Sequence, residues 1–184
     1  YSSEGKGLLL SSISDESNSK VVVIGCGEVG RASIDKSIQI GASVAAIDLN
    51  EEILTELKNK YQDKITTIIG GSEQAKNEIR SADLVIGAVL LPGRKPPIVI
   101  TEEDINQMEK GTVIIDVAID QGGCVENVKP NTHSEPFEIR SGVIVSAIAN
   151  LPGAVPKTSS IELSTIMQNY IDDLLIEDWF EKYK

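Results

Sequence analysis

Short apolar runs alternate with polar segments of helical spacing along most of this chain. The run from Val21 to Ile24 is β-branched and apolar at consecutive positions, as expected for a strand buried on both faces. Gly25 follows this run, and from about Arg31 apolar residues recur at helical spacing until Gly41, a residue type that commonly ends helices. The pattern therefore predicts a strand, a tight turn and a helix, in that order.

The same order repeats towards the C-terminus. Three later helices are expected to begin behind a polar capping residue, at Asn50, Ser72 and Thr101. Consecutive strand and helix units specify a doubly wound sheet, because parallel neighbours need crossover connections and these are right-handed. We therefore predict a Rossmann-type α/β fold with a mostly parallel sheet and strand order 3-2-1-4-5-6. The further strands are expected at residues 44–48, 65–69, 84–88, 113–117 and 143–147, and the helices at 51–61, 73–80 and 102–108.

Two segments depart from this alternation. The stretch from Gln121 to Gly142 is long and irregular, and its length marks it as functional or as a packed surface loop. Residues 159–184 are expected to form one long C-terminal helix, whose broad apolar face requires a partner. We expect Trp179 and Phe180 in this helix to pack against another portion of the protein or against another subunit.

The composition fits a single globular domain, 1–184, because its 184 residues are 41% hydrophobic and 24% charged. The sequence has neither a long uncharged apolar segment nor the order of a signal peptide, so we expect a soluble, cytoplasmic protein without a membrane partner. The formal net charge of −11 argues against nucleic acid as a partner and favours a small molecule. Cys26 and Cys124 are too few for a disulfide framework or a metal site.

Residues 25–30 read G-C-G-E-V-G, a G-x-G-x-x-G pattern that follows an apolar strand and opens a helix. In this context Gly25 makes the tight turn, Gly27 admits a pyrophosphate against the backbone, and Gly30 brings helix and strand close. The alternative, an ordinary corner between strand and helix, has less support because the flanking elements match. The candidate cofactor-binding residues of this loop are Gly25, Gly27, Glu28, Val29 and Gly30.

Asp48 ends the second predicted strand, about 20 residues past the glycine turn, where an acid accepts hydrogen bonds from the adenosine ribose. Its charge would repel a 2′-phosphate, so we predict NAD rather than NADP as the cofactor. The alternative role for Asp48 is that of a helix cap or turn residue. Cys26, inside the loop, is either a thiol of low pKa near a helix N-terminus or, in our preferred interpretation, a small filler residue.

Three stretches narrow the identity of the domain: D-L-V-I-G-A-V-L-L-P-G at 83–93, V-A-I-D-Q-G-G-C at 117–124 and A-N-L-P-G-A-V-P at 149–156. In this order and at these separations they resemble the NAD-binding domain of alanine dehydrogenases, over about Gly5 to Tyr170. The α subunit of the proton-translocating transhydrogenase shares the general plan. The run A-I-D-Q at 118–121 favours the dehydrogenase.

The resemblance implies further site residues at the carboxyl ends of the strands, where ligands of open α/β sheets bind. Asp120 is implied as the catalytic residue, beside the nicotinamide, where its carboxylate holds the bound ammonia or amino group. The alternative role for Asp120 is to cap the Gly122 and Gly123 bend. His133 is not expected to be a general base, because no acid partner is suggested. The other implied cofactor contacts are Val89, Leu90, Val117, Ala118, Ile119, Ile148, Ala149, Asn150 and Leu151.

The reaction implied by the resemblance is oxidation of L-alanine by NAD to an imine, which water converts to pyruvate and ammonium. The chain begins at Tyr1, and Leu8, Leu9 and Leu10 precede the first complete element, so we expect a piece of a longer protein. Because the family's substrate groups come mainly from another domain, the chain alone is expected to bind NAD weakly without turnover, and the intact protein to be a homo-oligomer. The alternatives are a transhydrogenase α-subunit domain and a non-catalytic NAD-binding module.

Overall fold

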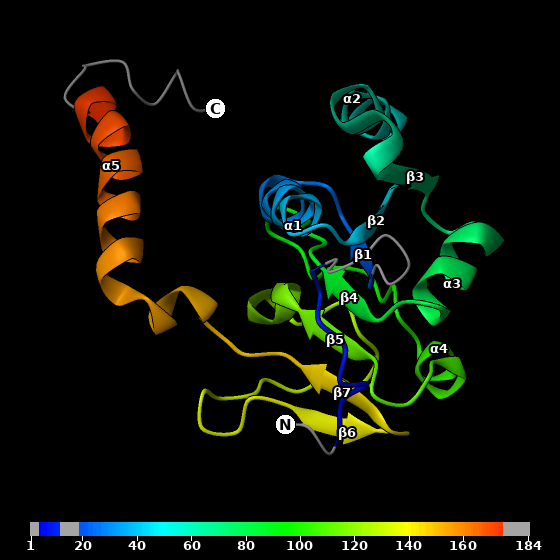
Figure 1. Ribbon diagram of the computed structural model, residues 1–184. Helices are drawn as coiled ribbons and strands as arrows, with labels where there is room; N and C mark the ends of the chain where they lie inside the picture. The colour runs from blue at the N-terminus through cyan, green and yellow to red at the C-terminus, as the bar shows by residue number, and fades with distance from the viewer. Residues whose placement is uncertain (1–3, 12–18, 175–184) are drawn as a thin grey trace. The chain divides into compact units, whose positions relative to one another are not determined.

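The computed structural model describes residues 4–11 and 19–174 of the chain, which divides into two units, Tyr1–Ala149 and Asn150–Lys184. In its described part, the first unit is built on a seven-stranded sheet with strand order β3-β2-β1-β4-β5-β7-β6 (Figure 1). Neighbouring strands are parallel except β6 and β7, which pair antiparallel. The strands are β1 (Lys20–Ile24), β2 (Ser43–Asp48), β3 (Ile65–Ile69), β4 (Leu84–Gly87), β5 (Val113–Asp116), β6 (Glu138–Arg140) and β7 (Val143–Ser146).

Helices connect the parallel strands and lie over both faces of the sheet. Ile34 and Leu57, from α1 and α2, belong to the hydrophobic core on one face. Ile79 and Ile105, from α3 and α4, belong to the core on the other face. The sheet therefore lies between two helical layers, as the Rossmann-type prediction requires. These elements are α1 (Glu28–Gln39), α2 (Glu51–Tyr61), η1 (Gln62–Lys64), α3 (Glu73–Arg80), α4 (Glu102–Gln107) and η2 (Val117–Gln121), where η marks a 3-10 helix.

The central strand β1 shows why the sequence has four apolar residues in succession. Val21 and Val23 face the core under α1 and α2, whereas Val22 and Ile24 face the opposite core, because successive side chains of a strand point to opposite faces. β1 pairs with β2 on one side and with β4 on the other. The predicted order 3-2-1-4-5-6 is confirmed for the parallel strands, with β7 in the sixth place.

The sequence prediction missed strand β6, which lies inside the stretch from Gln121 to Gly142 that was expected to be irregular. β6 has only three residues and forms the edge of the sheet, pairing with β7 alone. A strand of this length presents too few positions for an alternating pattern. The stretch is thus partly a packed edge of the sheet rather than a wholly irregular loop.

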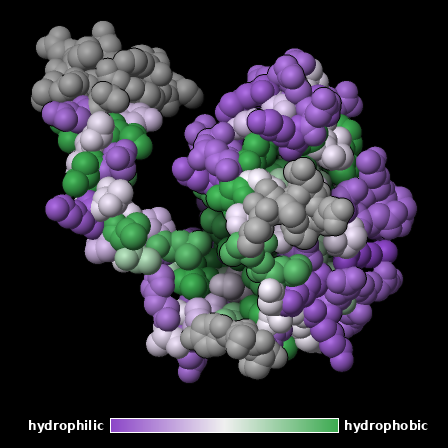
Figure 2. All heavy atoms as spheres, viewed as in Figure 1, coloured by the Kyte–Doolittle hydropathy of each residue, from purple (hydrophilic) through white to green (hydrophobic). Residues whose placement is uncertain are grey.

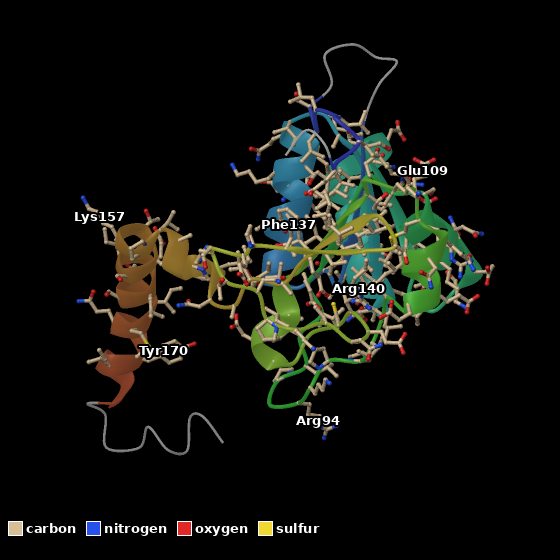
Figure 3. All side chains as sticks on the ribbon, turned by 90° about the horizontal axis from the view of Figure 1, so that it is seen from below. Arg94, Glu109, Phe137, Arg140, Lys157 and Tyr170 are labelled. Carbon is tan, nitrogen blue, oxygen red and sulfur yellow. The ribbon has the colours of Figure 1, made fainter. Side chains whose placement is uncertain are left out.

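Arg140, the last residue of β6, is labelled in Figure 3 and links this strand to the start of α4 through Glu102. Its Nη2 atom donates a hydrogen bond to the carbonyl oxygen of Glu126 at 2.7 Å, and its guanidinium forms an ion pair with Glu102. Glu126 in turn accepts a hydrogen bond from the backbone N–H of Glu102 at 2.8 Å. These contacts fasten the long connection after β5 to the body of the first unit.

Most element boundaries agree with prediction, and three of the differences have a local cause. α1 begins at Glu28 instead of near Arg31, because Gly27 already occupies the N-cap position. Val117, expected to end β5, belongs to η2, because the Asp116 side chain accepts a hydrogen bond from Ala118 N–H and turns the chain there. The C-terminal helix starts before residue 159, since proline is tolerated in the first helical turn.

The second unit contains η3 (Leu151–Ala154) and α5 (Pro156–Leu174). Residues 175–184, including Trp179 and Phe180, lie outside the described residues, so their expected packing stays a prediction. Hydrophobic and polar residues mix along α5 in Figure 2, and Figure 3 shows the Tyr170 side chain projecting from this helix. Of the helices that the structure describes, none has the length and hydropathy needed to cross a membrane. The exposed apolar residues of α5 are Ile161, Leu163, Ile166, Met167, Tyr170 and Ile171.

Candidate functional site

The loop between β1 and α1 has a shape that requires glycine at two positions. Gly25 has a φ angle of +89°, and a Cβ atom there would lie 2.6 Å from the carbonyl oxygen of Ala88. A Cβ atom at Gly30 would overlap the carbonyl oxygen of Gly25. The first glycine therefore permits the turn, and the third permits close packing of α1 on the loop, as the motif predicts.

The middle glycine faces open space. A Cβ atom on Gly27 would meet no other atom within 4 Å, and Gly27 is the N-cap of α1 without a side-chain hydrogen bond to the helix. The next two residues, Glu28 and Val29, are exposed, and Val29 retains 51% of its accessible surface. The first turn of α1 therefore has backbone N–H groups that no capping side chain covers, beside room for a ligand.

The carboxylate of Asp48 lies against the glycine loop. Its Oδ2 atom accepts a hydrogen bond from the backbone N–H of Cys26 at 2.6 Å, and its Oδ1 atom accepts one from Asn50 N–H at 2.9 Å. Asp48 thus serves partly as a turn residue, which was the alternative interpretation of the sequence. The same contacts also hold its charge next to the loop, where the ribose interpretation requires it.

Cys26 has the properties of a packing residue. Its side chain is buried, and burial followed by the nearby Asp48 carboxylate raises the pKa of the thiol to about 12. The position at the start of a helix therefore does not produce a thiolate at neutral pH. The filler interpretation is supported over that of a reactive thiol.

The loop after β4 continues from the contact between Ala88 and Gly25. Val89 is half-buried and packs against the core on the α3 and α4 face, whereas Leu90 retains 62% of its accessible surface. The chain then makes a tight turn in which Arg94 N–H donates to the carbonyl oxygen of Leu91 at 3.0 Å. Figure 3 shows Arg94 at the tip of this loop.

The predicted catalytic residue, Asp120, lies in the 3-10 helix η2 that follows β5 directly. Val117 and Ala118 of η2 are half-buried, Ile119 is buried, and Asp120 is exposed. The buried side chain of Ile119 anchors η2 to the core, and the exposed Asp120 follows it directly. Gly122, in the left-handed region with a φ angle of +103°, ends this short helix.

The last predicted contacts divide between the two units. Ile148 and Ala149 are half-buried and end the first unit, where Ile148 forms a parallel bridge with Asn131. Asn150 opens the second unit in the left-handed region with a φ angle of +52°, and Leu151 begins η3. The part of Asn150 and Leu151 in the site stays a prediction.

Three loops meet at the carboxyl edge of the sheet. The backbone N–H of Gly25 donates to the carbonyl oxygen of Ile47 at the end of β2, at 2.9 Å. Ala88 N–H, after β4, donates to the carbonyl oxygen of Ile24 at the end of β1, at 2.8 Å. β5 is parallel to β4, so η2 and Asp120 leave the sheet at the same edge. In a doubly wound sheet this edge is where ligands bind.

Sequence reasoning did not single out two residues near this edge, Leu49 and Asp116. Leu49 follows Asp48 and retains 78% of its accessible surface, which is unusual for an apolar residue at the end of a buried strand. A Cβ atom on Gly70 would lie 3.2 Å from Leu49 Cδ2, so the glycine leaves room for this side chain. Asp116 ends β5 and is completely buried. Neither position carries a sequence signal that distinguishes it from ordinary strand ends.

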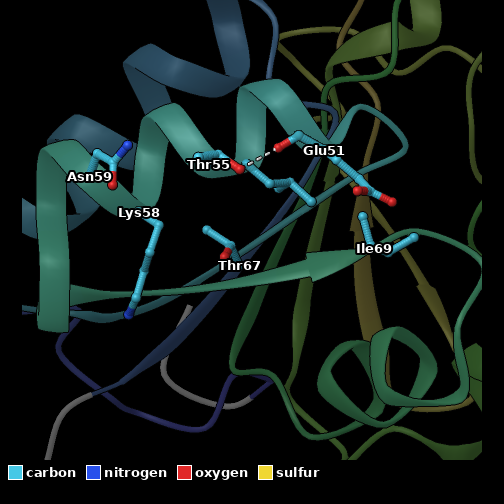
Figure 4. A pocket seen from close by; sticks show the side chains of 7 residues that line it. Glu51, Thr55, Lys58, Asn59, Thr67 and Ile69 are labelled. Carbon is cyan, nitrogen blue, oxygen red and sulfur yellow. Dashed lines mark hydrogen bonds between the residues drawn. The ribbon is translucent and has the colours of Figure 1, made fainter.

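A separate hollow of about 430 Å³ lies between α2 and β3 (Figure 4). Its lining contains Glu51, Thr55, Lys58, Thr67 and other residues of these two elements, and no residue of the glycine loop. This hollow therefore does not include the glycine loop of the candidate nucleotide site.

Comparison with known proteins agrees with this geometry. Residues 2–183 match the family model described as Alanine dehydrogenase/PNT, C-terminal domain. The chain belongs to this family.

Curated relatives of this alanine dehydrogenase/PNT domain include the alanine dehydrogenase of Bacillus subtilis (strain 168), which is 44% identical over 167 residues, 90% of this chain and 44% of that protein. The alanine dehydrogenase of Staphylococcus haemolyticus (strain JCSC1435) is 39% identical over 181 residues, 98% of this chain and 48% of that protein. The chain therefore spans about half the length of the curated relatives it matches.

Solved structures give the same fold for this alanine dehydrogenase/PNT domain. An L-alanine dehydrogenase, 36% identical, superposes with a TM-score of 0.88 over 96% of this chain and 49% of its own. A transhydrogenase from Sinorhizobium meliloti, 24% identical, superposes with a TM-score of 0.71 over 83% of this chain and 45% of its own. The second likeness is one of fold.

Proposed function

We propose that this chain is the NAD-binding domain of an alanine dehydrogenase, an NAD-dependent oxidoreductase that converts L-alanine to pyruvate and ammonium. The observation that carries the proposal is the hydrogen bond from Cys26 N–H to Asp48, which sets a carboxylate against a glycine loop with an open middle position. Family membership and alanine dehydrogenases among the relatives support the reaction.

The glycine loop fits a dinucleotide pyrophosphate. The open side of Gly27 leaves space for the phosphates, and the N–H groups at Glu28 and Val29 begin a helix whose positive end favours an anion. Gly25 and Gly30 hold this geometry because no other residue fits their positions. We assign the pyrophosphate to these five residues of the loop.

Asp48 fits the ribose of the adenosine half. An ionised carboxylate has about four acceptor positions, and the bonds from Cys26 and Asn50 use two of them. The remaining acceptor capacity suits the two ribose hydroxyl groups. A 2′-phosphate would place a second negative charge beside the carboxylate, which is why we propose NAD over NADP.

The nicotinamide would lie at the same edge of the sheet, beside η2. Bound NAD supplies the hydride acceptor, while the protein supplies orientation and electrostatics. Asp120 is the proposed catalytic residue, since its exposed carboxylate can hold the amino group of alanine in position. The other proposed contacts with the cofactor within the first unit follow the ends of its strands: Val89, Leu90, Val117, Ala118, Ile119, Ile148 and Ala149.

A transhydrogenase domain is the weaker alternative, because the transhydrogenase of known structure supports the fold alone. The second alternative is a non-catalytic NAD-binding module, which a measurement of turnover distinguishes from the enzyme. A cytoplasmic location and a homo-oligomeric assembly of the intact protein remain predictions.

The test is the steady-state rate of NAD reduction by the full-length protein that contains this domain, with L-alanine as substrate. Asp120→Ala should lower kcat by about a hundredfold, the size of effect seen when one preorganised electrostatic group is removed. The Kd for NAD should stay within about twofold, because Asp120 is not assigned to the adenosine or pyrophosphate. Asp63→Ala, which removes an exposed acid far along the chain in η1, is the matched control.

Two results would speak against the proposed reaction, and a third would speak against the role of Asp120. Hydride exchange between nucleotides without any dependence on alanine would favour the transhydrogenase class. NAD binding without turnover would favour the non-catalytic module. Full activity in Asp120→Ala would remove Asp120 from the catalytic role while leaving the cofactor site intact.

A further inference from the structure

We infer that Asp116 is a positioning residue, whose buried carboxylate fixes the turn that carries Asp120 to the edge of the sheet. The inference rests on the proposed function, because it concerns how Asp120 is held. The Asp116 carboxylate belongs neither to the G-x-G-x-x-G loop nor to the groups assigned to the proposed reaction.

Asp116 is the last residue of β5, and its accessible surface is 0%. Oδ1 accepts a hydrogen bond from Ala118 N–H at 3.0 Å. Oδ2 accepts two, from Cys124 N–H at 2.8 Å and from Val125 N–H at 3.0 Å. The Cys124 thiol lies 3.5 Å from Oδ1. One carboxylate therefore binds the chain both before and after Asp120.

These contacts close a loop. Residue 118 begins the loop and residues 124 and 125 end it, so Asp120 lies on a short segment with both ends attached to the same side chain. The buried side chain of Ile119 adds a third attachment to the core. Loss of the carboxylate would release the two ends while leaving β5 and the glycine loop in place.

Two neighbouring glycines allow this close packing. A Cβ atom on Gly123, whose φ angle is +74°, would lie 2.8 Å from Asp116 Oδ2. A Cβ atom on Gly87, in β4, would overlap the sulfur of Cys124. The backbone can reach the carboxylate only because both positions lack a side chain.

The chemistry of the contacts distinguishes a carboxylate from a carboxamide. All three backbone partners are N–H donors, and they divide between the two oxygens. Among the described residues, no lysine or arginine forms a salt bridge with Asp116. In Asp116→Asn the side-chain NH2 group would face a backbone N–H in either orientation. A side chain of equal size would thus lose at least one contact and leave a buried donor unpaired.

The experiment measures kcat, the KM for L-alanine and the Kd for NAD in the full-length protein with Asp116→Asn, Asp120→Ala and both together. Asp116→Asn should lower kcat by about ten- to a hundredfold, because small misplacements of a reacting group have effects of this size. The Kd for NAD should change by a smaller factor than kcat, because only the proposed contacts at Val117, Ala118 and Ile119 lie on the displaced turn, whereas the glycine loop and Asp48 lie outside it. In the Asp120→Ala background, Asp116→Asn should cause no further loss of kcat, because its effect acts through Asp120.

Gly123→Ala provides a second variant that displaces the same turn without altering the carboxylate. It should lower kcat in the wild-type background and leave the residual rate of Asp120→Ala unchanged. If Asp116→Asn fails to fold, as judged by circular dichroism, Gly123→Ala decides the question alone. The Glu103→Ala variant, at an exposed acid in α4, is the control.

A lower melting temperature with unchanged kcat would overturn the inference, because it would assign Asp116 to stability only. Losses that multiply in the double variant would also overturn it. Either result, with Asp120→Ala inactive, leaves the proposed function standing. Full activity in Asp120→Ala would remove the catalytic role of Asp120 and this inference with it, but would leave the proposed NAD site and reaction standing.

Discussion

At the scale of single residues, burial determines what the two cysteines can do. Burial, and then the Asp48 carboxylate, raises the pKa of Cys26 to about 12. Burial, and then the Asp116 carboxylate, raises the pKa of Cys124 as well. Because the thiolate is the reactive form, we expect both side chains to be unreactive in the folded chain at neutral pH. Cys26 packs in the core beside the glycine loop, and Cys124 packs against Gly87 in the connection after β5.

This predicts that neither thiol reacts with a disulfide reagent such as DTNB at pH 8 in the native chain. Both should react once the chain is unfolded in urea, since the pKa then returns to its ordinary value near 8.5 and about a quarter of each thiol is ionised. Asn59→Cys places a thiol on the exposed surface of α2 and is the positive control. A native cysteine that reacts as fast as the control would contradict this account of burial.

The sequence reveals some of these residues and not others. Gly25, Gly30 and Asp48 can be predicted because their spacing and their flanking elements form a known pattern. Asp116 cannot, because its partners are backbone N–H groups, which every residue except proline carries. Leu49 cannot be singled out either, because the sequence does not show that this apolar residue is exposed.

At the scale of elements, α4 has a fully formed capping box. The Thr101 hydroxyl accepts a hydrogen bond from Asp104 N–H, and the Asp104 carboxylate accepts one from Thr101 N–H at 3.1 Å. Arg80 of α3 forms an ion pair with the same carboxylate at 3.0 Å. Burial alone would raise the pKa of Asp104, but the bonds from Thr101 and Arg80 hold it below its ordinary value. Asp104 thus joins two helices on one face of the sheet.

Asp104→Ala should lower the free energy of unfolding by about 2–4 kcal/mol, because it leaves Arg80 without its partner and removes half of the capping box. The folded carboxyl has the lower pKa, so its contribution is present above the unfolded value of about 4 and is lost as the pH falls through the folded value. Urea unfolding at pH 7 and pH 3 measures both effects.

Glu103→Ala, in the same helical turn but exposed, is the matched control and should change the free energy of unfolding by less than about 0.5 kcal/mol. Equal effects of the two substitutions at pH 7 would show that the capping box contributes nothing beyond an ordinary surface acid. A difference that grows on acidification would show that the sign of the pKa shift is wrong.

The strands that are buried on both faces and the helices that begin with a capping side chain could be predicted from the sequence. The helices at 51–61 and 73–80 have the predicted bounds, because the capping side chains of Asn50 and Ser72 mark where they begin. The strand at 65–69 also has its predicted bounds. β6 was missed because three residues at a sheet edge carry no periodicity. The 3-10 helices η2 and η3 were missed because their bonds arise from local side-chain and turn contacts.

At the scale of the whole molecule, the doubly wound topology gathers the site from distant parts of the sequence. Parallel strands that run from β2 to β5 all deliver their following loops to one edge. The glycine loop, Asp48 and Asp120 share this edge although Gly25 and Asp120 lie far apart in the sequence. The chain covers 48% and 44% of the length of two curated relatives, so the full-length protein is the one in which to measure turnover.

The central claim is that the Asp48 carboxylate accepts hydrogen bonds from the adenosine ribose of NAD beside the glycine loop. Isothermal titration of the chain with NAD and NADP tests this claim most directly. Wild type and the Asp63→Ala control should bind NAD more tightly than NADP. Asp48→Ala should raise the Kd for NAD by about ten- to a hundredfold, the value of hydrogen bonds to a charged group. The difference between the Kd values for NAD and NADP should become smaller. An Asp48→Ala variant that binds NAD as tightly as wild type, with the same discrimination against NADP, would contradict the account.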